Sequence, residues 1–278
     1  MAATTAEPDT GPDTGPDTGP GGSLRVTLVQ RAASLEPADN LAALDDLPAL
    51  ASTADLVVLP EAFARDFGDP AGNLAPYAEP LDGPFASRLA ELAEQTGTAL
   101  LAGMFEQDAD RDDRPFNTLV LATPGGVTSY RKIHLYDSFG YKESDRLRAG
   151  ELSPVVVDLG GFRVGLMTCY DLRFPEMGRR LVDQGAEVLV VPAAWVAGEG
   201  KVRHWLTLAA ARAIEDTCYV VAVGQPGPRY TGHSTVITPE GEALVEAGEG
   251  PEVLTATLDR WVLDRARDRN PSLANRRL

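Results

Sequence analysis

The chain has 278 residues, of which 44% are hydrophobic, so it is long enough to fold as one sizeable α/β domain with its own core. Its formal net charge of −16 argues against a nucleic-acid or anionic-membrane partner, because phosphate binding requires a basic face. No apolar run approaches the roughly 20 residues of a membrane span, and the N-terminus does not resemble a signal peptide. The two cysteines lie far apart in the sequence, so we predict a reducing compartment and a cytoplasmic protein.

The first segment, residues 1–23, differs in composition from the rest of the chain. It contains Asp-Thr-Gly-Pro three times in tandem, with four acidic residues and no basic ones. Such a composition does not bury enough apolar surface to offset the entropy of the chain. We predict a disordered acidic tail over residues 1–23 and a single domain over residues 24–278.

Apolar β-rich runs then alternate with amphipathic helical patterns. In chain order we predict a strand at 24–30, a helix at 40–52, a strand at 55–59, a helix at 84–96 that stops at Gly97, a strand at 99–106, a hairpin at 117–132, a strand at 162–167, a helix at 175–184, a strand at 188–191, a helix at 206–216, and strands at 219–223, 233–238 and 253–258. This alternation indicates an α/β fold with helices covering the sheets. The pattern alone does not distinguish two sheets from one.

Three of the predicted strands are followed by a residue that is capable of catalysis. Glu61 follows the run Asp55-Leu-Val-Val-Leu-Pro, Lys132 closes the hairpin, and Cys169 follows Val164-Gly-Leu-Met-Thr. Strand ends gather functional groups in α/β proteins, because the scaffold is rigid there while the loops stay open. A helix N-terminus or a nearby cation lowers the pKa of a thiol, so Cys169 is a candidate nucleophile. Taken singly, none of the three requires a catalytic role: Cys169 fits a core cysteine, and Glu61 and Lys132 fit solvated surface charges.

The chain resembles the carbon–nitrogen hydrolase (nitrilase) superfamily in the order and spacing of three peptides, Leu-Pro-Glu61-Ala-Phe, Arg-Lys132-Ile-His-Leu-Tyr-Asp and Cys169-Tyr-Asp-Leu-Arg-Phe-Pro-Glu. The third peptide is similar to the Nit branch, which contains omega-amidase and deaminated glutathione amidase. True nitrilases usually carry a Trp-Glu pair after the cysteine, whereas this chain has Tyr170 and Asp171. The resemblance covers nearly everything from residue 24 to the C-terminus.

The resemblance implies a four-layer αββα sandwich, with two mixed sheets flanked by helices, that assembles into a homodimer or larger homo-oligomer. It implies Cys169 as the nucleophile, Glu61 as the base and Lys132 as the cation for the oxyanion, assisted by the backbone N–H of Tyr170. Glu143 matches a second family glutamate that positions the substrate and the lysine, although its charged loop also fits a solvated acid. No metal or organic cofactor is implied.

We expect hydrolysis of a small linear carboxamide to an acid and ammonia through a thioester. The expected substrate is the omega-amide of a dicarboxylic or 2-oxo acid, or a deaminated glutathione-like amide; an N-carbamoyl amide or a nitrile is the alternative. Trp195 lies in a loop that borders the pocket in the family, and residues 136–142 are a second candidate wall. Arg173 either meets a substrate carboxylate or pairs with Asp171 or Glu176, and we expect the pairing.

Other classes of function stay open at this point. A papain-type hydrolase needs a histidine beside its cysteine, and His204 or His233 is available, although we expect structural hydrogen bonds from these two and from His134. The three histidines show no metal-ligand spacing. A redox sensor needs a resolving cysteine, but Cys218 lies in the apolar stretch Thr217-Cys-Tyr-Val-Val-Ala-Val, so we expect it to be a core residue. A catalytically silent binding or assembly homologue would most simply lack a triad member, and none is missing.

Overall fold

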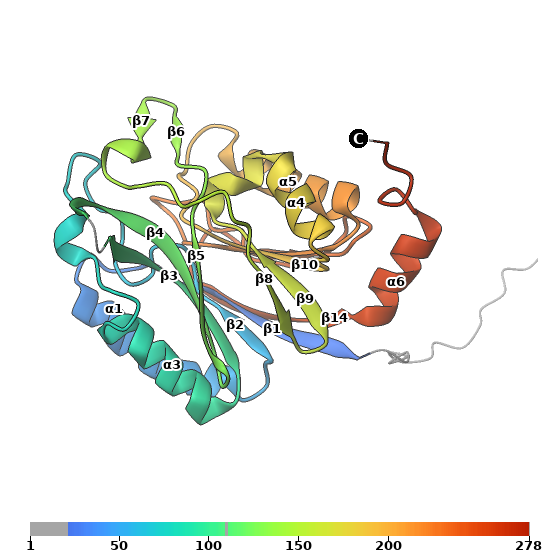
Figure 1. The fold of residues 1–278 in the computed structure, drawn as a ribbon, viewed down its shortest axis with the longest axis horizontal. Helices are drawn as coiled ribbons and strands as arrows, with labels where there is room; N and C mark the ends of the chain where they lie inside the picture. Colours follow the sequence, from blue (N-terminus) through green and yellow to red (C-terminus); the bar gives the residue numbers. More distant parts are fainter. Residues whose placement is uncertain (1–21, 109–110, 278) are drawn as a thin grey trace, which may run out of the picture.

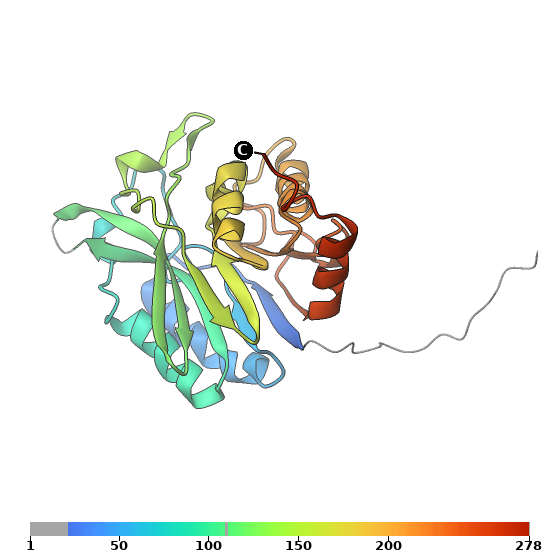
Figure 2. The same ribbon diagram turned by 45° about the vertical axis from the view of Figure 1, so that its right-hand side comes forward.

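The structure, a computed structural model, describes residues 22–108 and 111–277. Two six-stranded sheets pack face to face, and helices cover the outer face of each sheet (Figures 1 and 2). The expected αββα sandwich is therefore confirmed. The predicted acidic tail falls almost wholly outside the described residues, and the first strand begins at Ser23, one residue before the predicted start of the domain.

The first sheet has the strand order β14-β1-β2-β3-β4-β5. Its central strands β1, β2 and β3 are parallel, whereas β14, β4 and β5 join antiparallel, so the sheet is mixed. Its strands are β1 (Ser23–Gln30), β2 (Leu56–Val58), β3 (Ala99–Asp108), β4 (Arg111–Thr123), β5 (Gly126–Arg131) and β14 (Glu252–Asp259).

The second sheet has the order β13-β12-β11-β10-β9-β8, with β9, β10 and β11 parallel and the outer strands antiparallel. Its strands are β8 (Val156–Leu159), β9 (Phe162–Leu166), β10 (Val188–Ala193), β11 (Tyr219–Gly224), β12 (Thr235–Ile237) and β13 (Ala243–Glu246). A small hairpin of β6 (Asp137–Ser138) and β7 (Tyr141–Lys142) stands apart from both sheets (Figure 1).

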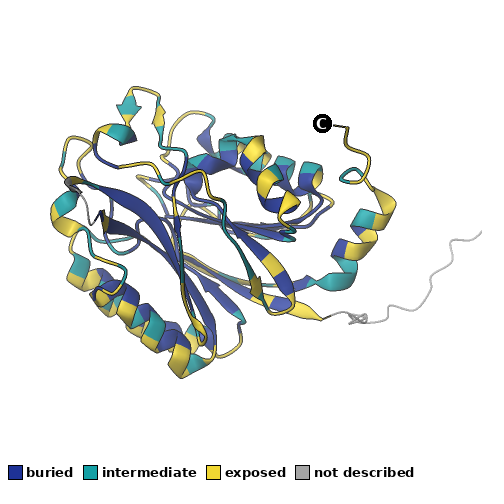
Figure 3. Ribbon diagram, viewed as in Figure 1, coloured by how far each residue is buried: buried dark blue, intermediate teal, exposed yellow. Residues whose placement is uncertain are grey.

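The central strands are buried on both faces, as Figure 3 shows by their dark blue colour. In β2, Leu56 and Val58 join the core between the two sheets, whereas Val57 packs in the layer of helices below the first sheet. Successive side chains of a strand point to opposite faces, so a strand of continuous apolar residues fits only between two other layers. The outer helices accordingly bury one face and expose the other.

Most predicted helices are present, with two corrections. Helix α3 (Pro84–Thr96) ends at Gly97, which adopts a left-handed φ of 71°, and α4 (Pro175–Asp183) also matches its prediction. The region 40–52 is not one helix: it forms α1 (Pro37–Ala43), a 3-10 turn η1 (Leu44–Asp46) and α2 (Leu47–Ala51), because Pro48 has no N–H with which to continue the first helix. Helix α5 (Lys201–Asp216) begins earlier than predicted, directly after Gly200.

Five of the helices and strands were not predicted: the hairpin strands β6 and β7, the edge strands β8 and β13, and helix α6 (Arg260–Arg269). Strands β8 and β13 lie at the edges of the second sheet, where exposed positions weaken the apolar pattern, and α6 is rich in arginine. The remaining short 3-10 segments are η2 (Ala75–Tyr77), η3 (Glu143–Asp145) and η4 (Cys169–Arg173). Across residues 22–108 and 111–277, no helix is both long and apolar enough to cross a bilayer.

Candidate active site

Glu61 lies three residues after β2, inside the protein. Its side chain is 1% exposed, and its carboxylate accepts hydrogen bonds from the side-chain amide of Asn117 (2.7 Å) and the backbone N–H of Ala194 (2.6 Å). The chain packs tightly here, because a Cβ on Gly103 of β3 would lie 2.4 Å from the backbone nitrogen of Ala62. Glycine at this position lets the two segments approach each other. The fold therefore fixes the carboxylate from several directions.

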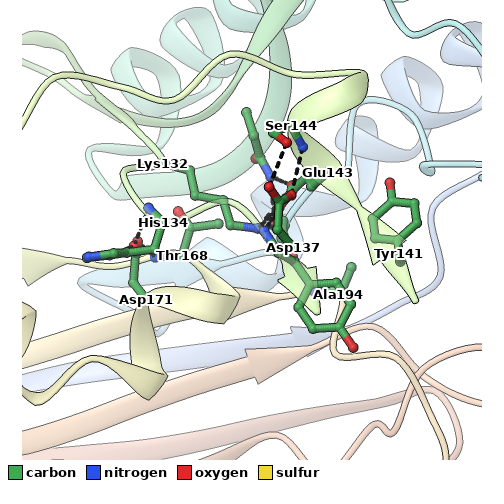
Figure 4. Close-up of polar contacts among 12 residues, drawn as sticks. Lys132, His134, Asp137, Tyr141, Glu143, Ser144, Thr168, Asp171 and Ala194 are labelled. Atoms are coloured by element: carbon green, nitrogen blue, oxygen red, sulfur yellow. Dashed lines mark hydrogen bonds and ion pairs between the residues drawn. The ribbon is translucent and has the colours of Figure 1, made fainter. Parts of the chain in front are cut away.

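Lys132 follows the last residue of β5 and is 2% exposed. Its ammonium donates to Oε1 of Glu61 (2.9 Å) and to both carboxylate oxygens of Glu143 (3.0 and 2.8 Å), as seen for Lys132 and Glu143 in Figure 4. Burial acts to lower the pKa of Lys132, but the charges of Glu143 and Glu61 outweigh it and raise that pKa well above its usual range. The lysine is a fixed cation at neutral pH.

Glu143 is the first residue of η3, directly after the β6–β7 hairpin. Glu143 is not a solvated surface acid, because it is 1% exposed. Its carboxylate accepts hydrogen bonds from the backbone N–H of Tyr136 (2.6 Å) and from Asn117 (3.2 Å) as well as from Lys132. Burial raises its pKa, while the neighbouring ammonium acts in the opposite direction. Two carboxylates thus flank one ammonium inside the protein.

Cys169 begins η4 immediately beyond β9 and Met167-Thr168. Its φ of 46° is unusual for a residue with a side chain and marks a sharp turn between the strand and the helical segment. The expectation of a lowered thiol pKa is wrong. Burial, and next the charge of Glu61, raise the pKa of Cys169 well above its usual range, although Lys132 acts to lower it. The thiol carries its proton at neutral pH, and the Glu61 carboxylate is near enough to the sulfur to raise this pKa through its charge and through a side-chain hydrogen bond.

These groups open into one cavity of about 400 Å³. Tyr170, Arg173 and Trp195 line it, as does the predicted second wall, from which Tyr136, Phe139 and Tyr141 contribute. None of the described residues that line the cavity is a histidine, so the papain-type arrangement around the cysteine is absent there. Among the described residues, no cluster of three or more His, Cys, Asp or Glu side chains is placed to hold a metal ion.

A sequence profile of one family, described as Carbon-nitrogen hydrolase, matches residues 25–268. The chain belongs to the carbon-nitrogen hydrolase family. It is 41% identical over 224 residues to the deaminated glutathione amidase of Escherichia coli, covering 80% of this chain and 84% of that protein. As a member of this family with such relatives, the protein is an enzyme that hydrolyses amide C–N bonds.

Solved structures of carbon–nitrogen hydrolases share the fold. Nit3 of Saccharomyces cerevisiae, a member of branch 10 of the nitrilase superfamily, has a TM-score of 0.79 at 29% identity and covers 92% of this chain and 97% of its own. An amidase from a Nesterenkonia species, in a glutamate variant with the acetamide moiety of fluoroacetamide added covalently at the active site cysteine, has a TM-score of 0.77 at 31% identity, with coverages of 95% and 100%. The resemblance to the Nit branch is thereby confirmed.

Asp171 ties two parts of this carbon–nitrogen hydrolase site together. Its buried carboxylate accepts hydrogen bonds from the Tyr130 hydroxyl (2.6 Å) and the Thr168 backbone N–H (2.8 Å). It also contacts Nδ1 of His134 at 2.7 Å, and Figure 4 shows these two side chains beside each other. Tyr130 and His134 flank the lysine, while Thr168 precedes the cysteine. The Asp171 carboxylate therefore connects the segment that carries Lys132 to the turn that carries Cys169. His134 has the structural role that was expected for it.

Arg173 does not pair with Asp171 or Glu176, so the expected bracing of the turn is wrong. Nε and Nη2 of Arg173 are buried and have no hydrogen-bond partner among the described residues. The guanidinium lies 4.8 Å from the centroid of the Trp195 ring. Stacking on an aromatic face holds a cation without neutralising it, and so this arginine keeps its donors for the cavity.

Sequence reasoning missed two side chains of the site. Asn117 donates to both buried carboxylates, and Lys201 lines the cavity from the start of α5. The first had a usable signal, since asparagine is uncommon within strands and a buried amide needs hydrogen-bond partners. The second ends the loop of Trp195, which was expected to border the pocket, but its side chain was not singled out because the predicted helix began after it.

Proposed function

We propose that this hydrolase cleaves the carboxamide C–N bond of a small linear amide through a thioester on Cys169. The observation that carries the proposal is the buried cluster in which Glu61 contacts both the thiol and the ammonium of Lys132. A protonated thiol needs a base close to it before it can attack a carbonyl, and Glu61 is placed to be that base. The covalent adduct at the cysteine of the Nesterenkonia amidase supports the same assignment here.

In the first half of the reaction, Glu61 takes the Sγ proton as sulfur bonds to the amide carbon. The carbonyl oxygen becomes an oxyanion, which Lys132 and the backbone N–H of Tyr170 stabilise. Glu61 then passes its proton to the amide nitrogen, the C–N bond breaks, and ammonia leaves. The acyl group remains on Cys169 as a thioester.

In the second half, a water molecule takes the place of ammonia. Glu61 accepts a proton from this water as its oxygen attacks the thioester carbon, and Lys132 again stabilises the oxyanion. The S–C bond breaks, the proton returns from Glu61 to Sγ, and a carboxylic acid is released. Glu143 does not touch the reacting atoms in this scheme: it holds the ammonium in place and shares Asn117 with Glu61.

We infer that the substrate carries a carboxylate at the end remote from the amide, as in the omega-amide of a dicarboxylic or 2-oxo acid or a deaminated glutathione-like amide. The support for this class is the unpaired guanidinium of Arg173 on the cavity wall. The rings of Trp195 and Tyr170, whose centroids lie 4.8 and 5.9 Å from this guanidinium, bound the space for the carbon chain. The similarity to proteins named amidases supports an amide, rather than a nitrile, as the substrate.

Ammonia release from a panel of compounds tests the proposal. The panel contains 2-oxoglutaramate, succinamate, deaminated glutathione, an aliphatic amide, an N-carbamoyl amino acid and a nitrile, with wild type beside Cys169→Ala. The buried Cys218 gives a matched control, because Cys218→Ala removes a thiol that does not line the cavity. We expect release from carboxylate-bearing amides that vanishes in Cys169→Ala and persists in Cys218→Ala. Release that persists in Cys169→Ala, or that is confined to the carbamoyl compound or the nitrile, contradicts the proposal.

A further inference from the structure

Lys201 is a buried cation on the wall of the cavity. The residue is 8% exposed, and its ammonium donates to the Tyr136 hydroxyl at 3.0 Å. The same ammonium lies 3.9 Å from the centroid of the Phe139 ring. Neither of these partners carries a negative charge.

The position of Lys201 is electrostatically unfavourable in three ways. It is the first residue of α5, where the helix dipole disfavours a cation. Its burial, and next the charge of Arg173, lower its pKa. Both cations also lie over the one Phe139 ring, Lys201 at 3.9 Å and Arg173 at 5.8 Å from its centroid, so they are close to each other.

No described carboxylate lies within ion-pair distance of Lys201 or Arg173 to offset these costs. The other cations on the cavity wall are occupied. Arg229 pairs with Asp66 at 2.7 Å, and the guanidinium of Arg146 donates to backbone carbonyls and to a tyrosine hydroxyl. An apolar, aromatic wall with two unneutralised cations is complementary to an anion that enters from outside.

We infer that Lys201 is a specificity-determining residue, which together with Arg173 forms a subsite for a carboxylate of the substrate. The inference rests on the proposed function and narrows it, because an amide without a carboxylate leaves both cations unpaired in the cavity. Arg173 supplies directional N–H donors. Lys201 supplies a positive charge, which its hydrogen bond to the Tyr136 hydroxyl holds in place. The enzyme should therefore prefer glutaramate to the neutral diamide glutaramide, which has the same carbon chain.

The test compares the ratio of kcat/KM for glutaramate to kcat/KM for glutaramide in wild type, Lys201→Met and Lys142→Met. Lys142 is the matched control, because it is an exposed lysine of the nearby β6–β7 hairpin that does not line the cavity. A hydrogen-bonded charge pair predicts that the ratio falls about tenfold to 100-fold in Lys201→Met and is unchanged in Lys142→Met. The ratio is insensitive to partial unfolding, because both substrates see the same folded fraction.

A second measurement keeps the inference separate from the proposed chemistry. Calorimetric titration of glutarate into Cys169→Ala, with and without Lys201→Met, measures carboxylate binding when no turnover is possible. We expect Lys201→Met to weaken glutarate binding by the same factor as it lowers the ratio. If no amide is hydrolysed, the proposed function fails and the titration alone decides the subsite. The inference is overturned if the ratio is unchanged in Lys201→Met or falls equally in Lys142→Met. It is also overturned if Lys201→Met does not change the affinity for glutarate.

Discussion

Replacing Lys132 with methionine tests the electrostatics of the buried cluster. In the native protein the ammonium lies 2.9 Å from a Glu61 oxygen and 2.8 Å from a Glu143 oxygen, and all three side chains are almost fully buried. Lys132→Met keeps a similar volume but leaves two carboxylates facing each other without the cation between them. We expect a loss of activity and a loss of stability that depends on pH.

The size of the stability loss follows from the geometry. Two unit charges about 5 Å apart repel by about 3 kcal/mol at an effective dielectric constant of about 20, and removing one partner of a buried ion pair costs about 3–5 kcal/mol. The variant avoids this repulsion by holding a proton on one carboxyl, and Glu143 is the candidate because burial already raises its pKa. A folded-state pKa above the unfolded value gives stability that is present at low pH and lost as pH rises. The slope is about 1.4 kcal/mol per pH unit.

Urea unfolding of wild type and Lys132→Met at about pH 5 and about pH 8 measures this effect. We expect the gap in unfolding free energy between the two proteins to be larger at the higher pH. The double variant Lys132→Met, Glu143→Gln removes one negative charge as well, so it should recover stability at the higher pH while staying inactive. A gap that does not change with pH, or a double variant that is no more stable than the single one, refutes the reasoning.

Three further predictions concern the geometry around the thiol. Asp171→Asn weakens the tie to His134, so we expect kcat to fall by on the order of 100-fold with a smaller change in KM; an unchanged kcat would show that the tie is not needed. Gly103→Ala places a Cβ against the segment of Glu61, so urea unfolding should report a destabilisation above about 2 kcal/mol, and native stability would contradict the close approach. Iodoacetamide labelling of Cys169, followed by mass spectrometry, should accelerate only at higher pH than for a free thiol because its pKa is raised, and a plateau near neutral pH would contradict this.

The parts of the site that could be predicted from the sequence are those at the ends of apolar strands. Glu61, Lys132 and Cys169 each follow such a strand. The strands before Glu61 and Lys132 belong to the first sheet and the strand before Cys169 belongs to the second, so the resemblance was needed to predict that the three side chains meet. Glu143 was ambiguous, because a charged loop gives no sign that one of its carboxylates turns inward.

The features that were predicted wrongly depend on three-dimensional surroundings. The direction of the Cys169 pKa shift is set by burial and by the nearby carboxylates, neither of which the strand-and-helix pattern reveals. The pairing of Arg173 with an acid of its own turn fails because Tyr130, His134 and Thr168 already occupy Asp171. Lys201 was missed because α5 begins directly after Gly200, at an earlier residue than the apolar periodicity of the helix indicates.

Trapping the acyl group with hydroxylamine tests the central claim, the thioester on Cys169, most directly. During hydrolysis of glutaramate, a thioester partitions between water and hydroxylamine after ammonia has left. The account predicts that hydroxamate forms at the expense of the acid while ammonia release is not slowed, and that Cys169→Ala forms neither product. Acid as the sole product at high hydroxylamine concentration, or hydroxamate formation by Cys169→Ala, would contradict the covalent mechanism.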